Sequence, residues 1–256
     1  SIFEEIGNIE INSRLFNKRV KIPKAEEEDP EPFTKEQMRL LLDRCSNHNK
    51  LKYMFLKDTG CRIGELVQIR KRDVNYTKNP IQIKIQSSYT KTKKARIVFV
   101  TIETASMLKR LLSKKSDEQL VFGTNEDAYI ATGTEKAEFT YYRGQLAKDY
   151  PEFGERYQSN NRHKKTVHSI RSFTATQCTE AIDESWGHGY IGHKKYLGQY
   201  IRNQDKQAEM FVRSENYLMI YEHIEVVDSD QRVDEMQKDV EKLQKMILIL
   251  QNTKSV

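Results

Sequence analysis

The chain contains two arginines in motifs that suit the chemistry of a phosphodiester. Arg62 lies in the run Thr-Gly-Cys-Arg-Ile-Gly-Glu-Leu at residues 59–66, and Arg171 ends the run His-Ser-Ile-Arg that starts at His168. A phosphodiester under attack gathers negative charge on its non-bridging oxygens, and planar guanidinium groups are well shaped to hold that charge. His168 and Arg171 are three residues apart, so on a helix both side chains would face one way.

Each motif also has a purely structural explanation. Arg62 and Glu65 could form an ordinary salt bridge. His168 and Arg171 could occupy a solvated helix face. The order of the motifs is more specific than any one of them: the Arg62 motif, a lysine-rich hairpin, the His168 motif, and then Gly-His at residues 192–193. A histidine can hydrogen-bond a phosphate oxygen or exchange protons near neutral pH.

In this order the motifs resemble the tyrosine recombinase (phage integrase) family, over roughly residues 30–225. The resemblance implies an α+β, mainly α-helical catalytic fold with a small antiparallel β-sheet. It implies a site-specific DNA recombinase or integrase that works through a 3′-phosphotyrosyl intermediate and needs no metal or other cofactor. In the family, two arginines and two histidines bind and activate the scissile phosphate. At the matching positions stand Arg62, His168, Arg171 and His193.

The resemblance also implies a general acid, a lysine in the hairpin turn that protonates the leaving 5′-oxygen. The turn reads Tyr-Thr-Lys-Thr-Lys-Lys-Ala-Arg at residues 89–96, directly before an apolar strand. The family's order of lysine, spacer, basic residue and strand selects Lys91. Lys93 and Lys94 are close enough to compete for the role. Lysines that only contact the DNA backbone would add affinity and salt dependence without chemistry.

Tyr200 is the expected nucleophile. A tyrosine hydroxyl is a poor nucleophile at its ordinary pKa, so it must approach a phosphate that cations already hold. His193, Tyr196 and Tyr200 are three and four residues apart and share a face on one helix, so periodicity does not choose between the tyrosines. In most relatives the tyrosine follows this histidine by nine residues, a position that Arg202 takes here. Tyr200 shortens the segment less than Tyr196 does.

His188 competes with His193 for the second histidine role. It lies in the run Trp-Gly-His-Gly at residues 186–189, and it follows Arg171 at a shorter offset than the family's. The two flanking glycines predict a loop at this point. His193 is therefore preferred. The pattern Gly-His-x-x-Tyr-Leu-x-Gln-Tyr from residue 192 resembles integrases of archaeal mobile elements more than bacterial resolving recombinases.

Apolar periodicity predicts the elements that position these residues. Helical spacing or helix-start signals mark five stretches. They lie at residues 34–42, 51–57, 63–70 and 102–114, and from residue 166 onward. Alternating isoleucines at residues 81–85, answered by residues 97–100, predict a β-hairpin. A late helix is expected to turn Phe211, Tyr217, Leu218 and Ile220 toward the core.

Three regions are expected along the chain. Residues 1–32 have the composition of a tail and linker from an upstream DNA-binding domain, and residues 33–225 would form the catalytic domain. In the third region, residues 226–256, apolar residues recur in steps of three and four, the a/d pattern of a coiled coil. They are Val233, Met236, Val240, Leu243, Ile247 and Leu250. The pattern indicates self-association on DNA, as a dimer or tetramer, but also fits one helix lying on its own domain.

Composition agrees with a polyanionic partner, which the resemblance implies to be double-stranded DNA attachment sites. The net charge is +6 and the isoelectric point is about 9.0. No apolar stretch is long enough to cross a bilayer, and three widely spaced cysteines indicate a reducing compartment. The expected location is therefore cytoplasmic, on host or element DNA.

Two other functions fit part of the pattern. A type IB topoisomerase would use the same constellation to relax supercoils without joining two sites, although the chain length and terminal heptads argue against it. A catalytically inactive DNA-binding regulator of the same fold would explain the shortened segment between His193 and Tyr200 as a lost nucleophile. A covalent protein–DNA adduct separates this last function from the other two.

Overall fold

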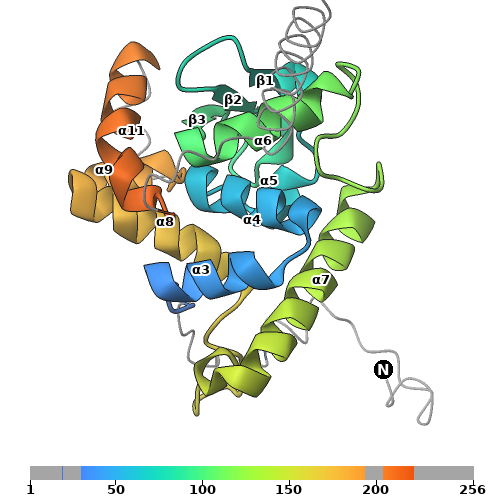
Figure 1. The fold of residues 1–256 in the computed structure, drawn as a ribbon, viewed down its shortest axis with the longest axis vertical. Helices are drawn as coiled ribbons and strands as arrows, with labels where there is room; N and C mark the ends of the chain where they lie inside the picture. The colour runs from blue at the N-terminus through green and yellow to red at the C-terminus, as the bar shows by residue number, and fades with distance from the viewer. Residues whose placement is uncertain (1–18, 20–29, 194–203, 222–256) are drawn as a thin grey trace, which may run out of the picture.

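The computed structural model describes residue 19, residues 30–193 and residues 204–221, which form a group of helices and one small antiparallel sheet (Figure 1). The helices are α3 (Lys35–Arg44), α4 (Asn47–Thr59), α5 (Ile63–Leu66), α6 (Ile102–Ser113), α7 (Ala128–Asp149), α8 (Val167–Ala181), α9 (Glu184–Tyr190) and α11 (Gln204–Leu218). The strands are β1 (Val74–Asn75), β2 (Gln82–Ile85) and β3 (Arg96–Phe99), and the 3-10 turns are η1 (Lys71–Asp73), η2 (Ser87–Tyr89) and η3 (Pro151–Phe153). The predicted mainly helical α+β fold is confirmed, while the expected C-terminal helix lies outside the described residues.

The sheet is a hairpin with one short extra strand. β2 and β3 pair antiparallel, with Gln82 opposite Phe99 and Ile85 opposite Arg96, as the alternating isoleucines predict. β1 joins the other edge of β2 and gives the order β1-β2-β3, and no sequence pattern predicted it. Ile83 and Ile85 are fully buried, which anchors the hairpin in the core.

The start of α3 and the end of α4 determine the path of the chain toward the site. Thr34 and Gln37 form the predicted capping box of α3. Helix α4 ends, as predicted, at Gly60, whose φ of 55° lies in the left-handed region that favours glycine. A Cβ on residue 60 would also lie 2.5 Å from the side chain of Ile191. Gly60 therefore allows a tight, closely packed turn directly before Arg62.

Helix α5 ends at Leu66, so the prediction that it continues to Arg70 is wrong. The backbone beyond Leu66 pairs with a distant segment instead. The Val121 N–H donates to the Ile69 carbonyl, and Arg70 forms an antiparallel bridge with Leu120. These bonds satisfy the backbone groups that a longer helix would have used.

The loop predicted around His188 is also wrong, because this residue lies in helix α9. Asp183 caps the helix by accepting a hydrogen bond from the Trp186 N–H. Gly187 lies where α9 meets α8, and a Cβ there would lie 2.6 Å from the carbonyl oxygen of Ala175. This glycine permits close helix packing and does not mark a loop.

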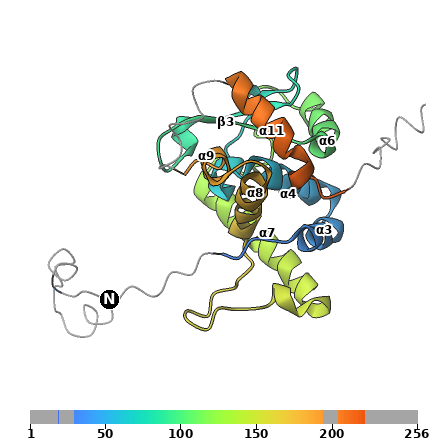
Figure 2. The same ribbon diagram turned by 90° about the vertical axis from the view of Figure 1, so that its left-hand side faces the viewer.

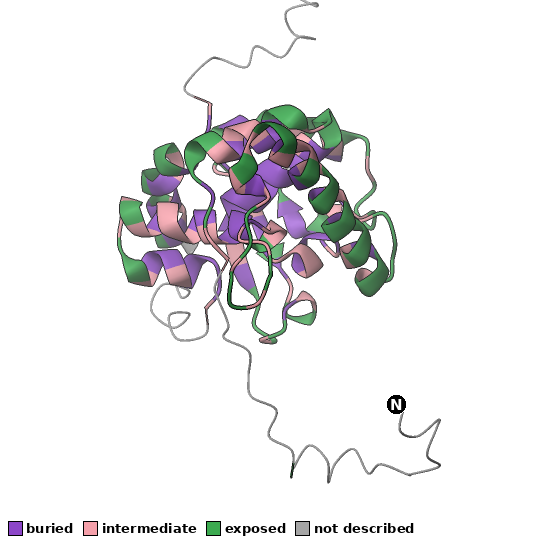
Figure 3. Ribbon diagram, turned by 90° about the horizontal axis from the view of Figure 1, so that it is seen from below, coloured by how far each residue is buried: buried purple, intermediate pink, exposed green. Residues whose placement is uncertain are grey.

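Helix α8 is the central helix and packs against α4, α9 and α11 (Figure 2). Buried residues occupy the middle of the molecule and exposed residues the outer helix faces (Figure 3). Phe211, Leu218 and Ile220 are buried as predicted, but Tyr217 is 42% exposed. It lies next to Leu218 in the chain and so about 100° away around the helix, which explains the wrong prediction.

Cys61 and Cys178 are free and buried, and a buried free cysteine packs like a small apolar residue. None of the helices in the described part of the chain is long and apolar enough to cross a membrane.

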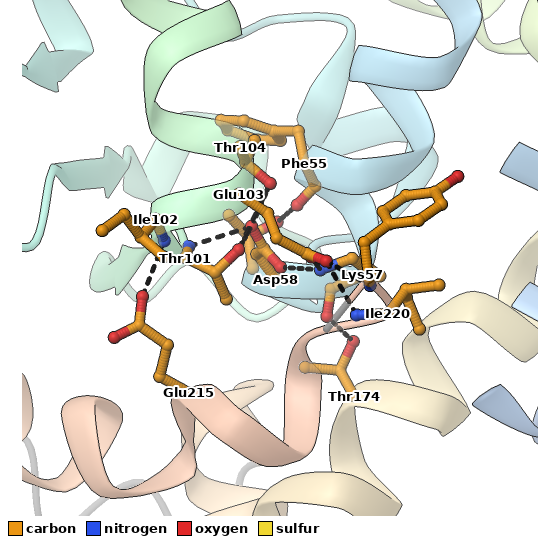
Figure 4. A network of polar contacts seen from close by, with 12 residues as sticks. Phe55, Lys57, Asp58, Thr101, Ile102, Glu103, Thr104, Thr174, Glu215 and Ile220 are labelled. Carbon is orange, nitrogen blue, oxygen red and sulfur yellow. Dashed lines mark hydrogen bonds and ion pairs between the residues drawn. The ribbon is translucent and has the colours of Figure 1, made fainter. Parts of the chain in front are cut away.

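A buried polar network joins α4 to α6 (Figure 4). The fully buried Lys57 contacts Asp58 at 2.6 Å and Glu103 at 3.0 Å. The other oxygen of Asp58 accepts hydrogen bonds from the N–H and hydroxyl of Thr101 and from the hydroxyl of Thr104. Pairing of this kind offsets the cost of burying the charge of Lys57.

The same network extends to α8 and to the end of α11. The Thr174 hydroxyl of α8 donates to the Lys57 carbonyl at 2.8 Å. Glu103 accepts the backbone N–H of Ile220 at 2.9 Å and that of Tyr221 at 2.6 Å. Four helices that are distant in sequence therefore meet around one lysine (Figure 4).

We expect Lys57→Met to lower the free energy of unfolding by about 3 kcal/mol or more, because two buried carboxylates would lose their cation. Urea denaturation followed by circular dichroism measures the change. Lys50→Met is a matched control on the same helix. Lys50 contacts the 53% exposed Asp43 and lies over the Tyr221 ring, so its loss should cost at most about 1 kcal/mol. Equal losses in the two variants would contradict this account of the network.

Candidate active site

A cavity of about 710 Å³ collects most of the predicted site residues. Its walls come from α5, α7, the turn between β2 and β3, and the start of α8. The predicted residues that line it are Arg62, Lys91, His168 and Arg171. His193 lies beside this group without lining the cavity. The predicted nucleophile Tyr200 and its rival Tyr196 lie outside the described residues.

Arg62 precedes α5 and is held by Glu65. The Arg62 backbone N–H donates to Glu65 Oε2 at 2.9 Å, and Arg62 Nη1 lies 3.2 Å from Glu65 Oε1. The ordinary salt bridge considered for this motif is thus present. The Arg62 side chain is nevertheless 32% exposed and lines the cavity. The same ion pair therefore orients a guanidinium that an incoming anion can still reach.

Glu65 also binds Arg96, for which no role was predicted. Arg96 Nη2 lies 2.6 Å from Glu65 Oε2, and its Nη1 lies 3.3 Å from Oε1, with both side chains buried. Burial alone would raise the pKa of Glu65, but the hydrogen bonds and charge of Arg96 lower it below the ordinary value. Strand alternation places Arg96 on the same face as the buried Val98, and this was the signal that could have identified it.

Arg171 is the most buried cation of the site, with 3% of its surface exposed. Its Nη1 donates to the carbonyl of Gly60, while Nε and Nη2 have no hydrogen-bond partner among the described residues. Burial, followed by the charges of Arg62 and Arg96, lowers the pKa of Arg171 to about 9. Arg171 thus remains a cation at neutral pH, with buried donors unpaired within the described structure.

His168 lies in the first turn of α8, on the cavity wall. Thr166 caps this helix by accepting the His168 N–H, and Ser169 completes a capping box. The side chain of His168 is exposed, in contrast to Arg171 three residues later. The N-terminal end of a helix carries a partial positive charge, which adds to the attraction for an anion.

Hydrogen bonds of Thr90 stabilise the turn between β2 and β3, which carries Lys91. The buried Thr90 hydroxyl lies within hydrogen-bond distance of the backbone carbonyls of Ser87 and Lys94, and it accepts the Lys94 N–H. Lys91 lines the cavity, whereas Lys93 and Lys94 do not. The cavity lining therefore favours Lys91, which the order of the motifs selects, over Lys93 and Lys94.

His193 lies directly after the turn at Gly192, whose φ is 88°. Burial, then the charges of Arg171, His188, Arg62 and His168, lower the pKa of His193 to about 4. Its Nδ1 lies 2.9 Å from Nδ1 of His188. His188 and His193, which compete for the second histidine role, therefore lie next to each other.

Helix α7 supplies a wall of the cavity that was not predicted from the sequence. The α7 residues with polar side chains on this wall are Tyr129, Thr132, Lys136, Thr140 and Arg143. They recur every three or four residues and so form one face of the helix. Tyr129 is 88% exposed. Their helical spacing is the signal that could have identified them.

Comparisons with known proteins identify the family of this chain. A model of the phage integrase family matches residues 31–206. The tyrosine recombinase XerA of Saccharolobus solfataricus is 30% identical over 110 residues, which cover 43% of this chain and 36% of that protein. The chain thus matches well under two thirds of the length of this curated relative.

Solved structures add a likeness of fold. The integrase from mycobacterium phage Brujita is 15% identical with a TM-score of 0.50, over 89% of this chain and 70% of that one. A crystal structure of XerA recombinase is 21% identical with a TM-score of 0.49, over 78% and 72% of the two chains. Since the family model matches more than half of the sequence and includes the Arg62 and His168 motifs, the chain belongs to the phage integrase family.

Proposed function

We propose that this protein is a site-specific DNA recombinase or integrase that cleaves and rejoins DNA strands through a 3′-phosphotyrosyl intermediate. The observation that carries the proposal is the state of Arg171. It is a buried guanidinium with two nitrogens unpaired among the described residues, in a cavity wall shared with Arg62, Lys91 and His168. A phosphodiester would supply both the negative charge and the acceptor oxygens for these donors.

In the proposed reaction the scissile phosphate lies in this cavity. Arg62 and Arg171 hold its non-bridging oxygens, and His168 and His193 donate hydrogen bonds to them. Both arginines are positioned in advance, Arg62 by Glu65 and Arg171 by a backbone carbonyl. Charge fixed in this way stabilises a transition state that is more negative than the ground state.

Tyr200 is the proposed nucleophile. Its hydroxyl gives up its proton to a base, its oxygen attacks phosphorus, the bond from phosphorus to the 5′-oxygen breaks, and a 3′-phosphotyrosyl bond forms. The 5′-oxygen leaves with a proton from Lys91, the one lysine of the hairpin turn that lines the cavity. Attack by a 5′-hydroxyl from another strand reverses the step and releases the tyrosine.

Double-stranded DNA attachment sites are the proposed substrate, and a net charge of +6 supports a polyanionic partner. Residues 33–225 form the proposed catalytic domain. Self-association on DNA, as a dimer or tetramer, is proposed for the heptad residues 233–250. The proposed location is the cytoplasm, on host or element DNA.

A nicked suicide duplex carrying the attachment site should trap a covalent protein–DNA adduct. Cleavage releases the short fragment between the scissile phosphate and the nick, and its 5′-hydroxyl is then no longer available to rejoin the strand. Mass spectrometry of the DNA-linked peptide should identify Tyr200. Tyr200→Phe should abolish the adduct and leave DNA binding intact, since only the attacking oxygen is removed. Tyr196→Phe, four residues away, is the matched control and should still form the adduct.

Other outcomes of this experiment would each redirect the proposal. An adduct on Tyr196 would overturn the choice of Tyr200. Absence of an adduct on DNA that the protein binds tightly would favour an inactive DNA-binding regulator of the same fold. Relaxation of supercoiled plasmid without joining of two sites would favour a reaction like that of a type IB topoisomerase.

Lys91→Ala should slow cleavage by about 10²- to 10⁴-fold, because the leaving oxygen would lack its proton donor. A substrate with sulfur in place of the scissile 5′-oxygen should restore most of the rate, since a thiolate leaves without a proton. Rates come from single-turnover cleavage of the suicide duplex.

Lys93→Ala and Lys94→Ala are the matched controls for the general acid. They should mainly weaken DNA binding and reduce its salt dependence. The substrate with sulfur in place of the 5′-oxygen should not raise the cleavage rates of these two variants more than that of the wild-type chain. Recovery of Lys93→Ala or Lys94→Ala, but not of Lys91→Ala, would move the general acid to that lysine.

A further inference from the structure

The turn between β2 and β3 is longer than an ordinary hairpin turn. The ladder between the two strands ends where Ile85 pairs with Arg96. Residues 86–95 therefore join the strands outside the ladder, whereas most hairpin loops have about two to five residues. Lys93 has a φ of 54°, in the left-handed region that residues with a Cβ disfavour. A turn of this length and geometry needs contacts outside the sheet to keep one conformation.

Asp73, the last residue of η1, supplies two such contacts. It is buried, with 4% of its surface exposed. Its Oδ1 accepts a hydrogen bond from the side-chain amide of Gln86 at 2.7 Å, and its Oδ2 accepts one from the Tyr89 hydroxyl at 3.0 Å. Gln86 and Tyr89 lie at the two ends of η2. One carboxylate therefore holds both ends of the 3-10 turn that leads to Lys91.

Asp73 is itself fixed in place by the backbone around it. Its Oδ2 also accepts the Arg70 backbone N–H at 3.0 Å, which forms part of a capping box of η1. The next residue, Val74, begins β1 and pairs with Ile83 of β2. A carboxylate forms stronger hydrogen bonds than a neutral acceptor does. The first part of the turn is thus tied to a strand that is anchored in the core.

Tyr89 connects Asp73 to the cavity. It is half-buried and lines the cavity together with Lys91, two residues later. Burial, followed by the hydrogen bond to Asp73, raises the pKa of Tyr89 above its ordinary value, so its hydroxyl stays a donor at neutral pH. Between Tyr89 and Lys91 lies Thr90, whose backbone N–H donates to the Ser87 carbonyl at 3.3 Å. The two residues directly before Lys91 are therefore both held by hydrogen bonds.

We propose that Asp73 and Tyr89 are positioning residues, whose hydrogen bond holds the turn in the conformation that places Lys91 on the cavity wall. The catalytic consequence rests on the proposed function, in which Lys91 protonates the leaving 5′-oxygen. A looser turn would bring the Lys91 amine within reach of that oxygen less often, and small misplacements of a reacting group slow a reaction strongly. Loss of the Tyr89 hydroxyl should therefore impair proton donation and leave DNA binding unchanged.

Fast amide hydrogen exchange of the full chain, without DNA, tests the hold on the turn. Tyr89→Phe keeps the ring and removes only the hydroxyl, so the hydrogen-bonded amides of Thr90, Lys93 and Lys94 should exchange faster than in the wild-type chain. Tyr76→Phe is the matched control, because Tyr76 is 41% exposed and does not line the cavity. Its exchange should match that of the wild-type chain. Unchanged exchange of the turn in Tyr89→Phe would overturn the proposal.

Single-turnover cleavage of the suicide duplex tests the catalytic consequence. Tyr89→Phe should cleave about 10- to 100-fold more slowly than the wild-type chain, as expected when a reacting group is misplaced. The substrate with sulfur in place of the 5′-oxygen should restore most of that rate, since a thiolate leaves without a proton. Thermal unfolding shows whether the variant is folded. A folded Tyr89→Phe variant that is equally slow on both substrates would contradict a role in positioning Lys91.

A double variant shows whether Tyr89 acts through Lys91. Tyr89→Phe should slow Lys91→Ala no further, because the group that Tyr89 positions is already absent. Losses that multiply would show that Tyr89 acts independently of Lys91 and would overturn the proposal. The affinity of Tyr89→Phe for DNA and its salt dependence should equal those of the wild-type chain, since no charge is removed. Weaker binding would identify the hydroxyl as a DNA contact and would also overturn the proposal.

The measurements without and with DNA distinguish this inference from the proposed function. If exchange in the turn rises in Tyr89→Phe but the wild-type chain cleaves no DNA, the proposed function fails, and Asp73 and Tyr89 still stand as the residues that hold the turn. If the wild-type chain cleaves DNA and Tyr89→Phe cleaves it equally fast, the proposed function stands and only the positioning role fails.

Discussion

Crowding of positive charge around one carboxylate is the constraint on which the site depends. Among the described residues that line the cavity, Glu65 is the only carboxylate. The cations on the same walls are Arg62, Lys91, Lys136, Arg143 and Arg171. Glu65 is already paired with Arg62 and Arg96. Burial first, and then the neighbouring positive charges, lower the pKa values of Arg171 and His193. An anion that enters this cavity relieves a repulsion that the fold has already built in.

The fold can hold these cations together because the elements behind them are joined by buried contacts. The Tyr190 hydroxyl of α9 donates to the Asp58 carbonyl of α4 and accepts the N–H of Phe99 in β3. The network around Lys57 adds α6, α8 and α11 to the same block. Gly60 follows two residues after Asp58, so the carbonyl that orients Arg171 lies at the edge of this block. Separation of the arginines would disrupt this block, and breaking a buried ion pair such as that of Lys57 costs about 3 to 5 kcal/mol.

Local sequence patterns predicted the parts of the site that depend on neighbouring residues. The Gly60 turn, the capping box of α3, the hairpin and the pairing of Arg62 with Glu65 all follow from spacings of a few residues. The wrong and missing predictions involve long-range contacts instead. Arg96 reaches Glu65 across 31 residues, α5 ends because its continuation pairs with a distant segment, and Gly187 of α9 allows close packing against α8. Periodicity carries no information about such partners, so a glycine-flanked histidine was interpreted as a loop residue.

Fixed charge of this kind suits a reversible strand exchange. Both the DNA phosphodiester and the phosphotyrosyl bond proposed here carry one negative charge, so cations such as Arg62 and Arg171 bind substrate and intermediate about equally well. The transition state between them carries additional negative charge, and only there does a rigid cluster of donors gain in strength. In the proposed reaction the cluster therefore lowers the barrier in both directions without favouring either side. If the chain catalyses that reaction, the direction of recombination comes from outside this cavity, from the DNA sites or from the assembly that holds them.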